Sequence, residues 1–313
     1  MPNSRDEFDS PWKQILEDYF SDFMAFFFPS IHQDIDWNSG YEFLDTELQK
    51  VVRDAELGKR FADKLVKVWK ISGDELWVFT HIEIQQSREA NFAERMFTYN
   101  YRLRDRHGKS IASLAVLTDD QQSWRPQEFQ TEIWGCKTRF RFPMVKLIDY
   151  EQQWSSLEQS SNPFATVVMA HLKTMETRDN ATDRKDWKLN ISQQLYSKGL
   201  KRQDVLNLFQ FIDWVMTLPT NLAVEFQSDL EKFERERQMQ YVTDIERRAL
   251  KKGRIEGALE AISLGLELKF GPASLRLIPA ISQIQDLTIL KAIQDGLRED
   301  KTLEEIKTIY ENE

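Results

Sequence analysis

Two strand-like runs joined by a glycine turn constrain the fold of this chain more than any other feature. Residues 61–70 and 75–86 are rich in Val, Ile, Leu and aromatic side chains, and Ser72-Gly73-Asp74 stands between them. Short runs of this composition on either side of a glycine-containing turn predict an antiparallel β-hairpin. The sequence before and after the hairpin has helical spacing.

The alternation of side chains in this hairpin gathers polar residues on one face. With Gly73 at the centre of the turn, the predicted pairs are Trp69 with Trp77, Leu65 with His81, and Asp63 with Glu83. Gln85 shares the face of Glu83 because strand side chains alternate. Opposed carboxylates have Cβ atoms about 4.5–5.5 Å apart and repel, so a divalent cation such as Mg²⁺ or Mn²⁺ is their simplest stabilising partner. A register shifted by one residue would put the two acids on opposite faces.

The rest of the periodicity predicts an α/β core with a mixed sheet, followed by an all-helical C-terminal part. Helices are predicted over 11–28, with Pro29 ending the first, and over 44–60, 89–104, 182–198, 201–217 and 225–268. Strands are predicted over 111–117, 131–135, 138–142 and 145–149. Asn162-Pro163 has the pattern of a helix start, and Thr302 to Glu305 that of a capping box. We expect three parts: the core over 1–155, a helical extension packed on it over 156–225, and a long charged helix with a small helical domain over 226–313.

Composition excludes several classes of protein. Among the 313 residues there are 42 Lys and Arg against 51 Asp and Glu, a net charge of −9. No apolar run reaches the roughly 18 residues of a membrane helix, so no membrane association is expected. The single cysteine, Cys136, rules out an internal disulfide and cysteine-based zinc sites, and it favours a cytoplasmic location. The sequence contains no glycine-rich nucleotide loop and no serine-hydrolase elbow.

Motifs in and around the predicted hairpin resemble the recombination-promoting nuclease (Rpn) family of transposase-like proteins, in particular its cyanobacterial members. The resemblance is carried by Phe28-Pro29, by YEFLD at 41–45, by RFADKLVKV at 60–68, by IEIQ at 82–85 and by FAERMFTYNY at 92–101. The segment from Leu266 to Ile309 is similar to a small helical domain of unknown function that often follows such nucleases. The resemblance covers most of the chain and is most specific between 41 and 101.

The resemblance implies a PD-(D/E)XK core of the restriction-endonuclease type and an Mg²⁺-dependent (or Mn²⁺-dependent) deoxyribonuclease that acts in recombination or mobile-element biology. Asp63 would take the first metal-ligand position, Glu83 the second, and Gln85 the position of the usual lysine. Glutamine forms hydrogen bonds but supplies no cation. Glu47, on the helix before the first strand, is the expected further ligand, although other acids between 42 and 56 are rivals for this role.

Candidate DNA-binding residues follow the hairpin. Arg95 and Tyr99 are one helical turn apart and are expected to reach a phosphate or to support the carboxylates; the alternatives are a salt bridge and packing. Arg102 begins the densest basic cluster, which continues with Arg104, Arg106, His107 and Lys109. This cluster fits the DNA backbone or a solvated helix end equally well. His81 shares the face of Glu83, but a structural role is the stronger interpretation of a histidine in a half-buried strand.

Two rival functions remain open from the sequence. Gln85 in place of lysine, together with the net charge of −9, is also consistent with a degenerate nuclease fold that binds DNA or protein without catalysis. The charged helix expected near 231–260 could pair with another copy of the chain to give a homodimer. Packing of that helix on its own domain is the alternative.

Overall fold

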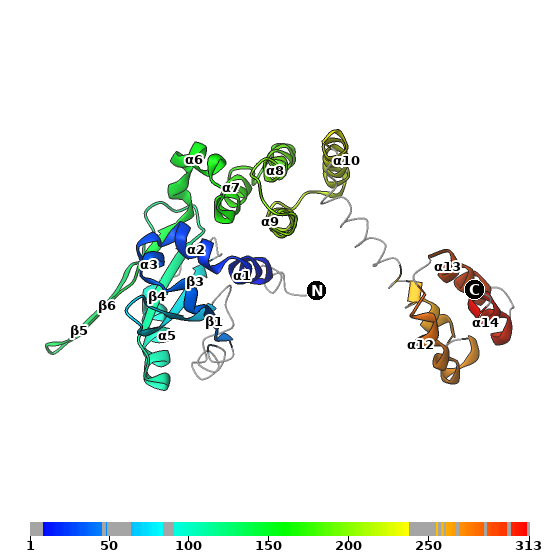
Figure 1. The fold of residues 1–313 in the computed structure, drawn as a ribbon, viewed down its shortest axis with the longest axis horizontal. Helices are drawn as coiled ribbons and strands as arrows, with labels where there is room; N and C mark the ends of the chain where they lie inside the picture. The colour runs from blue at the N-terminus through cyan, green and yellow to red at the C-terminus, as the bar shows by residue number, and fades with distance from the viewer. Residues whose placement is uncertain are drawn as a thin grey trace. The chain divides into compact units, whose positions relative to one another are not determined.

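The chain, described here from a computed structural model, divides into two compact units, one ending at Arg237 and the other beginning at Gln238 (Figure 1). The structure describes residues 9–45, 48, 64–83 and 91–237 of the first unit. It describes residues 255, 258, 259, 261–266, 269–284, 287–298 and 302–311 of the second. Within these ranges, no helix has both the length and the apolar character needed to cross a membrane.

A five-stranded mixed sheet forms the centre of the first unit, with the strand order β1-β2-β3-β4-β7. Its strands are β1 (Tyr41–Phe43), β2 (Lys64–Trp69), β3 (Glu75–Glu83), β4 (Ile111–Leu117) and β7 (Met144–Lys146). The pairs β1–β2 and β2–β3 are antiparallel, whereas β3–β4 and β4–β7 are parallel. The predicted α/β class with a mixed sheet is therefore confirmed, and β4 has its predicted bounds.

The β2–β3 hairpin exists as predicted, but its register differs by two residues. Trp69 lies opposite Glu75 and Leu65 opposite Phe79, so the turn is centred on Ser72. The Gly73 N–H donates to the Lys70 carbonyl at 2.8 Å, and Gly73 has φ 89° as the last residue of a three-residue loop. The predicted pairs centred on Gly73 are therefore wrong. A shift of two residues keeps every side chain on its predicted face, because strand side chains alternate with period two.

Helix α5 (Phe92–His107) covers one face of the sheet. The odd-numbered strand residues on this face form a core cluster with buried residues of α5, and the cluster includes Leu65, Phe79, Ala115, Leu117, Phe92, Met96, Tyr99 and Leu103. Apolar side chains of the even-numbered positions, such as Val66 and Val78, are also fully buried. The sheet is therefore buried on both faces, as expected for strands with continuous apolar runs.

The N-terminal helix is interrupted where the sequence pattern predicted a continuous one. α1 (Asp9–Asp18) and α2 (Phe20–Phe27) meet at Tyr19, whose φ is −134°. The Tyr19 hydroxyl donates to Asp204 at 2.8 Å, and burial together with this carboxylate raises the pKa of the phenol. A tertiary hydrogen bond thus accompanies the break. Pro29 begins the short helix α3 (Pro29–Asp34) at its first position and does not simply end the preceding helix.

Helices continue the first unit beyond β7. They are η2 (Leu147–Gln153), α6 (Trp154–Gln159), α7 (Pro163–Glu176), α8 (Ala181–Leu195), α9 (Arg202–Val215) and α10 (Thr220–Glu236). The strand predicted over 145–149 gives way to the 3₁₀ helix η2 after Lys146. Asn162 caps α7 as predicted, its side-chain oxygen accepting the Phe164 N–H at 2.9 Å. Helix α10 begins at Thr220, five residues before the predicted start at 225.

The second unit has its own apolar core. Its described elements are η3 (Pro272–Leu277), α12 (Ile278–Ile281), α13 (Leu287–Arg298) and α14 (Leu303–Glu311). Ile262, Leu266, Ile281, Leu290, Ile293 and Ile306 lie in this core with no exposed surface. The predicted capping box is confirmed, since the Thr302 N–H donates to Glu305 at 2.7 Å. The helix predicted over 225–268 falls partly on residues 238–254, which lie outside the described residues.

His171 of α7 is a buried histidine against the sheet. One ring nitrogen, Nε2, lies 2.8 Å from the Thr118 carbonyl, and the ring meets the edge of Trp12 at 6.3 Å. Nε2 must carry the proton to donate to this carbonyl. Burial lowers the pKa of His171, because an imidazolium would lose its hydration there. Burial therefore favours the neutral form of this histidine in the folded chain.

We predict that His171 makes the first unit less stable in acid. Its folded pKa lies below the unfolded value of about 6.5, so the unfolded chain binds the extra proton. Above about pH 6.5 the histidine does not lower the free energy of unfolding. As the pH drops from there toward the folded pKa, the free energy of unfolding falls by at most about 1.4 kcal/mol per pH unit. The free energy of unfolding, measured with urea between mildly acidic and neutral pH, should depend less on pH in H171Q than in the wild type. The control H32Q changes a half-buried histidine; equal slopes for wild type and H171Q would contradict the prediction.

Candidate functional site at the carboxyl edge of the sheet

The predicted metal ligands fall largely outside the described residues. Asp63, Gln85 and Glu47 lie outside them, and Glu83 is described only by its backbone at the end of β3. Among the described side chains, no group of three or more His, Cys, Asp or Glu is placed to hold a metal ion. The two-carboxylate site and its Mg²⁺ or Mn²⁺ therefore stay predictions.

The parallel strands end together at the edge of the sheet where Glu83 stands. Glu83 of β3 pairs with Leu117 of β4, and Leu117 pairs with Lys146 of β7. The chain leaves β4 through Thr118 and Asp119, which are both buried. Ligands of open α/β sheets bind outside the carboxyl ends of parallel strands. This edge is therefore the place in the first unit where the fold favours a functional site.

A buried ion pair occupies part of this edge. Lys146 Nζ lies 2.6 and 2.7 Å from the two carboxylate oxygens of Asp119 and donates to the Trp124 carbonyl at 3.1 Å. The two side chains are 0% and 1% exposed. Charges withdrawn from water are tolerated only when they are paired and hydrogen-bonded, and all three donor positions of the ammonium are used here. Lys146 is therefore neutralised by Asp119 and supplies no free cation to the edge.

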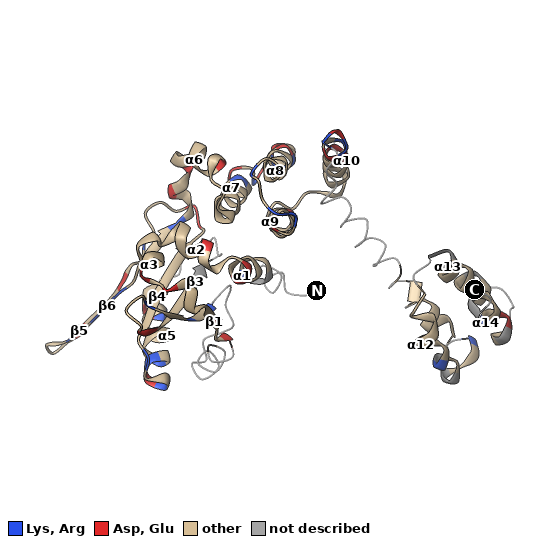
Figure 2. Cartoon of the chain, viewed as in Figure 1, with Lys and Arg blue, Asp and Glu red and all other residues tan. Residues whose placement is uncertain are grey.

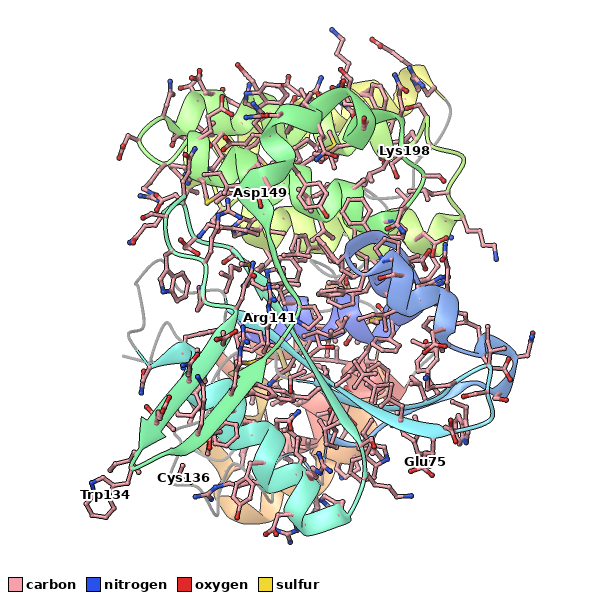
Figure 3. All side chains as sticks on the ribbon, turned by 90° about the vertical axis from the view of Figure 1, so that its left-hand side faces the viewer. Glu75, Trp134, Cys136, Arg141, Asp149 and Lys198 are labelled. Atoms are coloured by element: carbon pink, nitrogen blue, oxygen red, sulfur yellow. The ribbon has the colours of Figure 1, made fainter. Side chains whose placement is uncertain are left out.

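A second ion pair, which is exposed, joins the loop after β4 to the segment after β7. The Arg125 guanidinium donates to both carboxylate oxygens of Asp149, at 2.8 and 2.5 Å. Hydrogen bonds from Arg125 hold the pKa of Asp149 below its usual range. Asp149 is the third residue of η2, which directly follows β7, and it is labelled above Arg141 in Figure 3. The loop after β4 is thereby tied to the segment after β7.

Helix α5 carries the predicted DNA-binding residues to different surroundings. Arg95 and Tyr99 face the sheet and are only 5% and 1% exposed, with the Tyr99 ring 5.2 Å from that of Phe79. This burial favours packing, the alternative that the sequence offered for Tyr99. Arg102 is half-buried near the end of the helix. Contact of these three residues with a nucleic acid stays a prediction.

Arg95 brings a permanent positive charge toward the carboxyl edge. Its guanidinium lies 5.3 Å from the ring centre of Phe92, which meets the Trp124 ring at 5.6 Å. Trp124 in turn accepts from Lys146 through its carbonyl. An arginine stays charged in any protein environment, and a stacked guanidinium is a familiar phosphate-binding group. Arg95 thus adds a cation to the layer between α5 and the strand that ends in Glu83.

The pattern of the sequence carried a signal for Asp119 and Lys146 that the sequence prediction did not use. Lys146 interrupts the apolar run from Met144 to Ile148, and Asp119 follows the apolar β4 after a single threonine. A charged residue inside an apolar run must find a partner. The partner lies 27 residues away, so spacing alone does not identify it.

We predict that the Lys146–Asp119 pair is costly to break. K146M removes the charge with little change in volume and leaves Asp119 buried without its partner. The free energy of unfolding should fall by about 3–5 kcal/mol, measured by urea denaturation. K146M/D119N should recover part of the loss, because an amide is less costly to bury than a lone carboxylate.

The matched control for this prediction is R125M. It breaks the pair with Asp149, in which both side chains are well exposed, so about 0–1 kcal/mol is expected. Equal losses for K146M and R125M would show that burial does not set the cost of the inner pair. A loss in K146M/D119N larger than in K146M would lead to the same conclusion.

Comparison of the chain with protein-family models, with curated proteins and with solved structures gave no match in any of the three. The resemblance to the recombination-promoting nucleases therefore stands on the motifs quoted above.

Proposed function

We propose that the chain is a metal-dependent DNA endonuclease that hydrolyses phosphodiester bonds at the carboxyl edge of its sheet. Asp63 and Glu83 would hold an Mg²⁺ or Mn²⁺ ion, and Glu47 would serve as a further ligand. The proposed biological setting is recombination or mobile-element biology, which follows from the motif resemblance. The finer PD-(D/E)XK assignment of the sheet belongs to the same proposal.

The observation that carries the proposal is the register of β2 and β3. Odd-numbered residues of both strands, such as Leu65 and Phe79, lie opposite each other and face α5. A continuation of this register by one residue would bring Asp63 opposite His81 and diagonal to Glu83. Diagonal positions have Cβ atoms roughly 7 Å apart or less, a separation that a shared cation and its water can bridge. If the register continues in this way, both acids would project from one face of the sheet.

The surroundings of this edge suit a phosphate. Asp119 is fully engaged with Lys146, so it adds no repulsion to an approaching anion. Gln85 would hold the attacking water by a hydrogen bond. When bound, the metal ion lowers the pKa of a water ligand and stabilises charge on the phosphate.

Plasmid nicking tests the proposal. The purified chain should nick supercoiled DNA with Mg²⁺ or Mn²⁺ and not in EDTA. D63N and E83Q should each lower the rate to about one hundredth of wild type or less, because several kcal/mol of transition-state stabilisation depends on the metal. D34N is the matched control, since Asp34 is an exposed acid of α3 that pairs with Lys70.

Two outcomes would remove the proposal. One is the absence of nicking by the wild type with either metal. The other is nicking that D63N and E83Q leave unchanged, which would point to a contaminating enzyme. The non-catalytic alternative, a nuclease-like fold that binds DNA or protein, would then be the better account of Gln85.

A further inference from the structure

A β-hairpin separate from the main sheet reaches away from the body of the first unit (Figure 1). It consists of β5 (Glu128–Ile133) and β6 (Cys136–Arg141), joined by the two-residue turn Trp134–Gly135. The strands predicted over 131–135 and 138–142 start three and two residues late, and the first of them wrongly includes the turn residues Trp134 and Gly135. Both turn residues have positive φ, 49° and 81°, as a tight hairpin turn of the primed type requires.

Trp134 is an unusual residue for this position. Its side chain is 100% exposed at the tip (Figure 3), although tryptophan is one of the most buried residue types on average. It is the only residue other than glycine with positive φ in the described part of the chain. Glycine or asparagine takes this conformation at lower cost, and a bulky residue there is an outlier. Within the described part of the chain, the residue therefore adds strain and a fully exposed apolar side chain, which points to a role in binding.

The hairpin presents a charged face and an apolar face. Opposed residues share a face, so one face carries Glu128 with Arg141, Gln130 with Arg139, and Glu132 with Lys137. The other face is anchored on α5 at its base, where Phe97 stacks on Phe129 with ring centres 5.0 Å apart and an interplanar angle of 16°. Tyr101, an exposed residue one turn along α5, extends this aromatic row by stacking on Phe97.

The charge of this region is opposite to that of the whole chain. Between Arg95 and Arg141 there are nine Lys and Arg against five Asp and Glu, whereas the chain as a whole has 42 against 51. Glu128 and Glu132 neutralise part of the charged face through Arg139 and Lys137. The end of α5 adds Arg102, Arg104 and Arg106, and Figure 2 shows Lys and Arg gathered there. The region thus combines a positive balance with exposed aromatic side chains.

We propose that the β5–β6 hairpin and the end of α5 form a DNA-binding surface in which Trp134 stacks on a base. Lys137, Arg139 and Arg141 would contact phosphates along the strand. A two-stranded ribbon fits the major groove of duplex DNA, and apolar side chains at such tips unstack base steps. A basic groove with aromatic side chains is equally the pattern of single-strand binding. The inference deepens the proposed nuclease function, because it names the surface that holds the substrate.

The charge balance favours DNA over a second copy of the chain as the partner of this surface. A second copy of the chain has a net charge of −9, but its hairpin region is positive. In a symmetric dimer the two hairpin regions would face each other, and their positive charges would repel. The guanidinium and ammonium groups of β6 are exposed, as phosphate contacts require. Contact between copies through the apolar tip is the alternative that the experiment must separate.

Fluorescence anisotropy with labelled DNA in EDTA tests the inference without cleavage. The probes are a short duplex and a single strand of the same sequence. W134G suits the positive φ and removes the ring, so the hairpin should keep its fold while affinity falls about tenfold. K137Q/R139Q should lower the slope of log affinity against log salt by about two. The matched control is K232Q/R235Q on α10, where Arg235 is as exposed as Arg139, at 68% against 61%.

The outcomes separate this inference from the proposed catalysis. Absence of DNA binding by the wild type overturns the inference, and so does unchanged binding by both W134G and K137Q/R139Q. Sedimentation that turns from dimer to monomer in W134G, with unchanged DNA affinity, assigns the tip to contact between copies and also overturns it. Loss of binding in the hairpin variants without nicking by the wild type removes only the catalysis. Preference of the wild type for one probe, lost in W134G, supports the inference and identifies which form of DNA Trp134 contacts.

Discussion

The register of the β2–β3 hairpin is the constraint on which the rest of the first unit depends. Gly73 ends a three-residue loop, so the strands pair about Ser72, and this pairing decides which side chains meet α5. A shift by one residue would send Leu65 and Phe79 to the opposite face and empty the core on the α5 side. The turn therefore also determines where the odd-numbered side chains of these strands lie, including those proposed for the functional site.

The carboxyl edge shows how the fold accommodates charge inside an apolar layer. Lys146 and Asp119 are buried as a pair with complete hydrogen bonding, whereas Arg95 keeps its guanidinium against the Phe92 ring. The first arrangement is electrically neutral and acts as a structural tie between β7 and the loop after β4. The second packs the arginine side chain against an aromatic ring of the same helix. A charged side chain thus lies in an apolar layer in two ways, by complete hydrogen bonding in the pair and by stacking for the arginine.

The sequence predicted local features well because local features depend on nearby residues. The apolar run of β4 and the Asn162 cap were found from a few neighbouring positions. The break at Tyr19 was not found, because it accompanies a hydrogen bond to Asp204 far along the chain. The turn centre was also missed, since a glycine marks a turn without giving the length of its loop. The same holds for the candidate site. Which residues of a strand share a face of the sheet was predictable, because side chains alternate along a strand. The partner of Lys146 was not, because it depends on how β4 and β7 pair.

The projecting hairpin bears on the apparent conflict between an acidic chain and the nucleic-acid substrate that we propose. Association with DNA depends on the charges within about 10 Å of the phosphates at moderate salt, since more distant charges are screened. The hairpin carries three cations against two acids, and the end of α5 adds most of the local positive excess, so the net charge of −9 weighs less on binding here than its total suggests. The same screening explains why an exposed aromatic tip is useful: stacking on a base is insensitive to the charge of the rest of the chain. The strained turn that displays Trp134 is therefore best understood as part of the binding chemistry of the hairpin.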